Sequence, residues 1–156
     1  MKTCATRESE LPLKLKLDRT FQPCPEAPGD ELYPNGIFVF NITRLLAFIE
    51  AHPHAFPVGS VALADLPDYA GADCLDAEAI PNADLRRPIL LAEISPHSYN
   101  VIDGHHRIAR ARREGSATLP TVSIRCPHHM AFLTSTRAYK AYVEYWNSKC
   151  KDSTPS

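Results

Sequence analysis

The chain has 156 residues, 22% of them charged, and a formal net charge of −1 at pH 7. Its length allows one domain with a single sizeable core, and its balanced charge excludes a protein that attracts nucleic acid over its whole surface. The five cysteines are scattered, without a C-x-x-C pair or a disulfide framework. The sequence shows neither a signal peptide nor a stretch apolar enough to span a bilayer, so we expect a cytoplasmic protein with no membrane partner.

The composition divides the chain into an N-terminal arm, a domain and a C-terminal tail. Residues 1–34 are polar and rich in proline, and the alternating leucines of residues 11–17 indicate an edge strand or an extended segment laid on the domain. Residues 35–147 contain most of the apolar segments and form the predicted domain. Residues 148–156 are expected to be a loose tail.

The first half of the predicted domain combines short strands with one helix. Asn35-Gly36 is a turn signal, and Ile37–Phe40 is a short apolar run typical of a buried strand. Asn41–Thr43 offers N-cap candidates for a helix over Arg44–Ala51, whose apolar residues have helical spacing. Residues 58–63 are predicted to form another short strand.

The second half contains the longer strands. Residues 88–94 are almost continuously apolar, which is typical of a strand covered on both faces. Residues 99–102 and 119–125 are predicted as two further strands, and a short helix is predicted near residues 76–80. The last helix, over residues 134–147, carries an aromatic stripe that indicates core packing rather than cofactor binding.

A glycine turn between a strand and a helix carries the clearest signal for chemistry. Asp103-Gly104 breaks the strand that ends at Ile102, and a helix is predicted from His105 to Gly115. A helix N-terminus carries a partial positive charge and N–H groups without helical partners, which suit a phosphate or another anion. Gly104 is expected to let a ligand approach the backbone, because a Cβ would occupy that space. We therefore expect these amides to face an open anion pocket.

Asp103 is the unusual member of this turn, because a carboxylate repels a phosphate. It fits an anion site if it holds a metal ion, accepts a proton or orients one of the histidines. The alternative is that Asp103 caps the helix and that His105 and His106 lie on its surface.

Three segments of the chain resemble the ParB/sulfiredoxin superfamily: Arg87–Leu90, Asn100–Arg107 and Leu119–Val122. The resemblance lies within residues 86–125. It implies an α/β (α+β) domain in which a small mixed sheet is flanked by helices. It also implies that the helix after the glycine turn binds the phosphates of a nucleotide.

Two branches of this superfamily differ from the chain at the turn. Sulfiredoxins place a catalytic cysteine directly before a His-Arg pair, where this chain has His105. The chromosome-segregation ParB proteins have Gly-Glu-Arg-Arg where this chain has Gly104-His-His-Arg107, and no helix-turn-helix segment follows here.

The Asp-Gly-His-His-Arg form is most similar to small stand-alone members and to the free-serine kinases. This similarity implies active-site roles for Asp103 and His106. Those kinases also use a catalytic glutamate in an upstream loop, where this chain offers Asp65 and Asp68 instead.

These observations lead to a hypothesis for the role of each residue. The backbone N–H groups of His105–Arg107 and the Arg107 guanidinium bind phosphate oxygens of a nucleoside triphosphate or diphosphate. His106 donates a hydrogen bond to the transferring phosphate, while Asp103 orients it or holds Mg²⁺. Asp68 is the candidate base acting on a small hydroxyl-bearing acceptor or on water. The predicted activity is that of a phosphotransferase or an NTPase.

A zinc site is a second hypothesis, because histidine, cysteine and aspartate side chains recur around the neighbouring strand. Its candidate ligands are Asp103, His105, His106, Cys126, His128 and His129. Adjacent residues of a helix point in different directions, so His105 and His106 can hardly bind the same ion.

A third hypothesis is a ParB-like nuclease or DNA-associated module without kinase activity. Its support is the arginine cluster of the predicted helix: Arg107, Arg110, Arg112 and Arg113. A solvated helix face is the plainer explanation of such a cluster.

Overall fold

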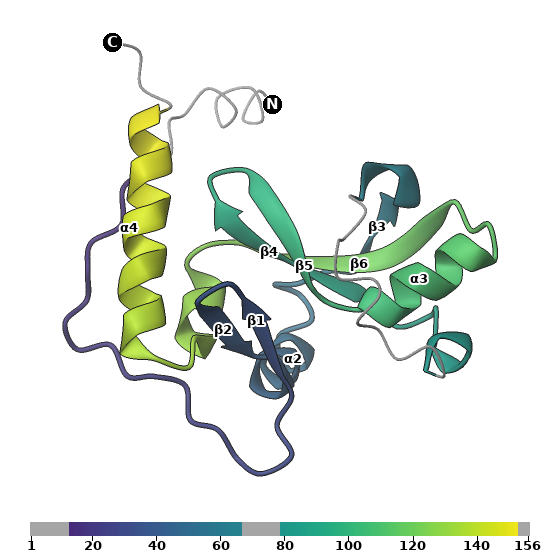
Figure 1. Ribbon diagram of the computed structural model, residues 1–156, viewed down its shortest axis with the longest axis horizontal. Coiled ribbons are helices and arrows are strands. Elements are labelled where there is room, and N and C mark those ends of the chain that lie inside the picture. The colour runs from purple at the N-terminus through teal and green to yellow at the C-terminus, as the bar shows by residue number, and fades with distance from the viewer. Residues whose placement is uncertain (1–12, 67–78, 153–156) are drawn as a thin grey trace.

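The computed structural model describes residues 13–66 and 79–152 (Figure 1). Within these ranges the protein has a mixed α+β fold, with a two-stranded and a four-stranded sheet flanked by helices. The four-stranded sheet contains both parallel and antiparallel pairs, which confirms the predicted small mixed sheet. None of the helices in the described ranges is long and apolar enough to cross a membrane.

A β-hairpin and a helix form the first unit. Strand β1 (Leu32–Asn35) pairs antiparallel with β2 (Phe38–Asn41), and Gly36 adopts a φ of +66° in the turn that the Asn-Gly signal predicted. Helix α2 (Ile42–Ala51) follows directly, because the Asn41 side chain accepts a hydrogen bond from the Arg44 N–H at 3.1 Å. The predicted cap is confirmed, but β1 crosses the boundary placed between arm and domain.

The four-stranded sheet has the order β3-β6-β4-β5. Its strands are β3 (Gly59–Ala62), β6 (Thr118–Ile124), β4 (Ile89–Ser95) and β5 (Ser98–Asp103). A tight turn joins β4 to β5, so these two are antiparallel, whereas helix α3 (His105–Arg113) lets the chain return to form β6 parallel to β4.

The sheet has an apolar core on each face. Successive residues of a strand point to opposite faces, so Ile89 and Val101 pack with α3, while Leu90 and Ile102 pack with α2 and α4. This arrangement explains why β4 is almost continuously apolar, as the sequence predicted. Figure 1 shows α3 near one end of the molecule and α4 at the other, with the sheet between them.

Helix α4 (Thr136–Asp152) holds the N-terminal arm. Its aromatic stripe is buried, as predicted: Tyr139, Tyr142, Val143 and Trp146. The Trp146 Nε1 donates to the Leu13 carbonyl at 2.9 Å, and the Asn147 side chain exchanges two hydrogen bonds with the backbone of Leu15. Over the described residues 13–31 the arm is therefore an extended segment laid on the domain, not an edge strand. The helix continues through residues 148–152, so the loose tail predicted to start at residue 148 was wrong there.

Three short 3₁₀ helices complete the described elements: η1 (Leu63–Asp65), η3 (Ile80–Asn82) and η4 (His128–Phe132). Of the short helix predicted near residues 76–80, only the last two residues lie within the described ranges, and η3 begins at Ile80.

Candidate functional site

The predicted strand, glycine turn and helix are all present. Strand β5 ends at Asp103, Gly104 takes a φ of +109°, and α3 begins at His105. The Ile108 N–H donates to the Gly104 carbonyl at 3.0 Å, which closes the first turn of the helix. No side chain in the described ranges caps this N-terminus, so the alternative in which Asp103 is the cap is wrong. The first residues of α3 thus follow directly on the turn at Gly104.

Gly104 is explained by internal packing. A Cβ at this position would lie 2.6 Å from Cγ2 of Ile89 and 3.0 Å from Nη2 of Arg107. The distance to Ile89 is far below ordinary van der Waals contact and the distance to Arg107 is tight, and the positive φ also disfavours a side chain. The space predicted to admit a ligand is therefore filled by β4 and by the first turn of α3.

Asp103 and Arg107 form an ion pair, with Nη2 3.0 Å from Oδ2. The pair is largely buried, since the Arg107 and Asp103 side chains are 9% and 13% exposed. The Arg107 Nε is also buried, and it has no hydrogen-bond partner among the described residues. Asp103, predicted as a metal ligand and a catalytic group, thus contacts the guanidinium that was predicted to bind phosphate.

The two histidines lie beside this pair at the start of α3. The Tyr33 ring stacks on the His105 ring, with centroids 5.4 Å apart and planes 17° from parallel. Burial lowers the pKa of His105, and the nearby Asp103 charge opposes that shift in part. His106 is half-buried. The Tyr33 ring of the β1–β2 hairpin therefore covers His105 at the helix start that was expected to face an open pocket.

Tyr33 was missed by the sequence reasoning because it lies in the segment taken for the arm. No local pattern links it to His105, and only the packing of the hairpin against β5 brings the two rings together. The candidate base Asp68 lies outside the described residues, and the other upstream candidate, Asp65, is exposed in η1.

The zinc hypothesis finds no support in residues 13–66 and 79–152, where no group of three or more histidine, cysteine, aspartate or glutamate side chains is arranged to hold a metal ion. His129 is fully buried, and its Nε2 donates to the Glu93 carbonyl. Burial lowers the pKa of His129 to about 4 and raises the pKa of the Cys126 thiol to about 11. Both side chains are thus neutral at pH 7.

Glu93 organises the buried polar groups around His129. Its carboxylate accepts the backbone N–H groups of His97 at 2.9 Å and Cys126 at 3.1 Å. Its carbonyl accepts a second hydrogen bond from the Tyr142 hydroxyl at 2.7 Å. The network ties β4 to η4 and α4, so its role is structural.

The arginine cluster does not form a single open basic face. Besides the buried Arg107, Arg110 donates to the Ala83 carbonyl at 2.6 Å and pairs with Glu114, and Arg112 donates to the Leu66 carbonyl at 3.0 Å. These bonds fasten α3 to the segments on either side of residues 67–78. Arg112 and Arg113 are both exposed.

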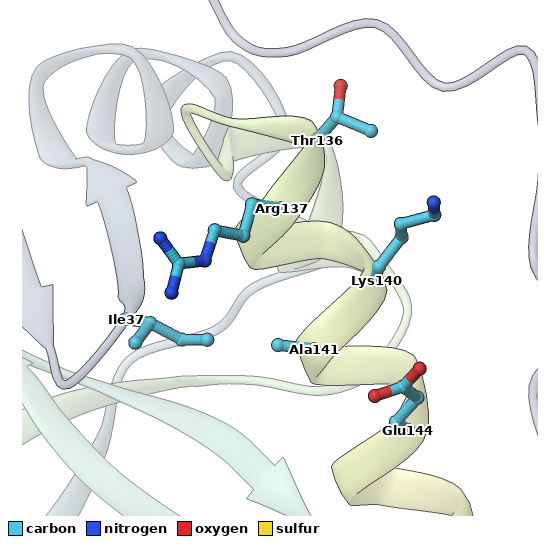
Figure 2. Close-up of a pocket in the computed structure, with 6 residues that line it drawn as sticks. All are labelled: Ile37, Thr136, Arg137, Lys140, Ala141 and Glu144. Atoms are coloured by element: carbon cyan, nitrogen blue, oxygen red, sulfur yellow. The ribbon is translucent and has the colours of Figure 1, made fainter.

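A separate hollow of about 490 Å³ lies between the hairpin turn and α4 (Figure 2). Its lining residues are Ile37, Thr136, Arg137, Lys140, Ala141 and Glu144. Figure 2 shows the Arg137 side chain extending toward Ile37, while Lys140 points away from it. None of the predicted site residues lines this hollow.

Comparison of the chain with protein-family models, with curated proteins and with solved structures finds no match. The fold and the site therefore define a class in structural terms: a mixed α+β domain in which a glycine turn opens a helix beside a buried arginine–aspartate pair.

Proposed function

We propose that the protein binds a nucleotide through its phosphates at the first turn of α3, as the ParB/sulfiredoxin resemblance implies. One observation supports this most: the guanidinium of Arg107 is held against the N-cap residue Gly104 and is buried with an Nε that lacks a described partner. A phosphate oxygen there would supply the missing hydrogen bond.

The electrostatics of the turn favour the same ligand. The N-terminus of α3 contributes a partial positive charge, and Arg107 contributes a full one within the first turn of the helix. Burying a charged group without complete pairing costs free energy, so a dianionic phosphate gains more from this position than a neutral ligand would.

Phosphoryl transfer or hydrolysis is the activity that we propose for this site. His106, next to Arg107, donates to the transferring phosphate, and Asp103 holds Mg²⁺ or orients His106. Asp68 remains the proposed base for a small hydroxyl-bearing acceptor or for water. The proposed phosphoryl transfer rests on the resemblance alone. The proposed anion site is supported by the resemblance and also by the packing of Arg107.

The test of binding is calorimetry with ATP, ADP, CTP and GTP, each with and without Mg²⁺. A charge-assisted hydrogen bond contributes about 1.5–3 kcal/mol, so Arg107→Ala should weaken nucleotide binding by about ten- to a hundredfold. Arg113→Ala is the matched control, because Arg113 lies on the same helix but is exposed. Equal affinities of wild type and Arg107→Ala, or no binding of any nucleotide, would overturn the proposal.

The test of turnover is phosphate release from the nucleotide that binds. His106→Ala is expected to retain most of the binding and to lose the release of phosphate, since His106 acts on the transferring group. A rate unchanged by this substitution would remove His106 from the chemistry while leaving the binding site intact.

A further inference from the structure

We propose that Asp103 is an internal anion that occupies Arg107 when no ligand is bound, and that the incoming phosphate replaces it. This inference rests on the proposed nucleotide site and concerns how that site is regulated. The carboxylate and the phosphate compete for the same guanidinium, so the ion pair sets the affinity of the site.

The geometry of the pair is the first argument. Asp103 contacts Arg107 through one oxygen and one nitrogen, Oδ2 and Nη2, at 3.0 Å. The Nε of the same guanidinium is buried and has no described partner. In arginine, Nε and Nη2 point along one edge of the planar group, and that edge matches two oxygens of one anion. The carboxylate therefore accepts a hydrogen bond from one of the two nitrogens on this edge, whereas a phosphate can accept from both.

The position of the carboxylate is the second argument. Asp103 ends β5 immediately before Gly104, the N-cap residue of α3, and no side chain among the described residues makes a capping hydrogen bond there. Its side chain contacts the guanidinium, so it lies where an anion bound to Arg107 would lie. A phosphate dianion carries more charge than the carboxylate and has an oxygen for each of the two nitrogens, so we expect it to displace the carboxylate.

The exchange has a consequence for the chemistry of the site. The Asp103 carboxylate is released from Arg107 only when a phosphate has bound. It then becomes available to a cation or a proton at the stage when phosphoryl transfer requires one. Before binding, the pair keeps both charges neutralised in a partly buried position.

The experiment compares Asp103→Asn with wild type in calorimetry with ATP and, separately, with inorganic phosphate, both in EDTA to exclude metal. The substitution keeps the shape of the side chain and removes its charge. We expect about tenfold tighter binding, because the competing charged hydrogen bond is weakened. Glu114→Gln is the matched control, since it removes a carboxylate that pairs with Arg110 at the other end of the same helix. This control should change the affinity less than twofold.

A double-mutant cycle separates competition from a general change in charge. In the Arg107→Ala background, Asp103→Asn should not increase the affinity for phosphate, because there is no guanidinium left to compete for. An equal gain in both backgrounds, or unchanged or weaker binding to Asp103→Asn alone, would refute the exchange while leaving the nucleotide site in place. Failure of wild type and every variant to bind would refute both proposals.

A measurement on the wild-type protein covers the case in which Asp103→Asn does not fold. The ¹⁵N signal of the Arg107 Nε–H reports its hydrogen bonding directly. Saturation with inorganic phosphate should shift this signal and also the ¹³C signal of the Asp103 carboxyl group. A carboxyl signal that stays unchanged while phosphate binds would show that the pair does not open.

Discussion

The substitution Gly104→Ala tests the packing that holds the candidate site. A Cβ at this position would lie 2.6 Å from Cγ2 and 2.9 Å from Cβ of Ile89, and the backbone φ is +109°. The positive φ costs about 1–3 kcal/mol for a residue with a side chain. Overpacking against a buried isoleucine adds about 1–3 kcal/mol. We therefore expect Gly104→Ala to lower the free energy of unfolding by about 2–6 kcal/mol.

Gly115→Ala is the matched control for the backbone contribution. Gly115 also has a positive φ, +73°, but a Cβ there meets nothing within 4 Å. Its substitution should cost about 1–2 kcal/mol, from the left-handed conformation alone. The difference between the two variants gives a first measure of the contact with β4, since both positions have a positive φ.

Urea unfolding followed by tryptophan fluorescence measures both variants, because Trp146 is the one tryptophan of the chain and is buried. In an Ile89→Ala background the clash with Cγ2 is removed, so Gly104→Ala should cost at least about 1 kcal/mol less than in wild type. Equal losses of stability for Gly104→Ala and Gly115→Ala, with no coupling to Ile89, would refute the packing argument.

Three further predictions concern the remainder of the fold. The pKa of His129 is lowered from 6.5 to about 4 in the folded protein, so as the pH falls this histidine takes up a proton in the unfolded chain before it does so in the folded one. The free energy of unfolding should therefore fall by about 3 kcal/mol as the pH decreases from 6.5 to 4, and His129→Gln should lack this part of the loss in urea titrations at each pH. Tyr142→Phe removes one of the two donors to the Glu93 carbonyl and should cost about 1 kcal/mol in urea unfolding; an unchanged stability would contradict the network. Asn147→Ala removes both hydrogen bonds that hold the arm at Leu15 and should speed amide exchange there by about tenfold, whereas unaltered exchange would mean that the arm is held elsewhere.

Local patterns predicted the elements well, because their causes lie within a few residues. The Asn35-Gly36 turn, the Asn41 cap and the helix that starts after Gly104 are all present. The end of α4 was misplaced, because the polar residues after Asn147 still continue the helix. The arm could be described only as two alternatives, because its partner is more than a hundred residues away in the sequence.

The candidate site was only partly predictable. The sequence located Asp103, Gly104 and Arg107 in one turn, but their spacing does not say whether the carboxylate faces a metal, the helix or the guanidinium. The four-residue separation across the turn allows the ion pair, and the burial of both side chains makes it favourable.

By itself, the sequence determined the order of strands and helices from β2 onward and the position of the glycine turn, since hydrophobic periodicity and turn residues act over short distances. It did not predict β1, most of which lies in the segment taken for the arm. The tertiary structure decided that Ile89 excludes a side chain at Gly104 and that Tyr33 covers His105. Those contacts join segments that are distant in the chain. They depend on the register of β4 against β5 and on the docking of the hairpin, which no local pattern specifies.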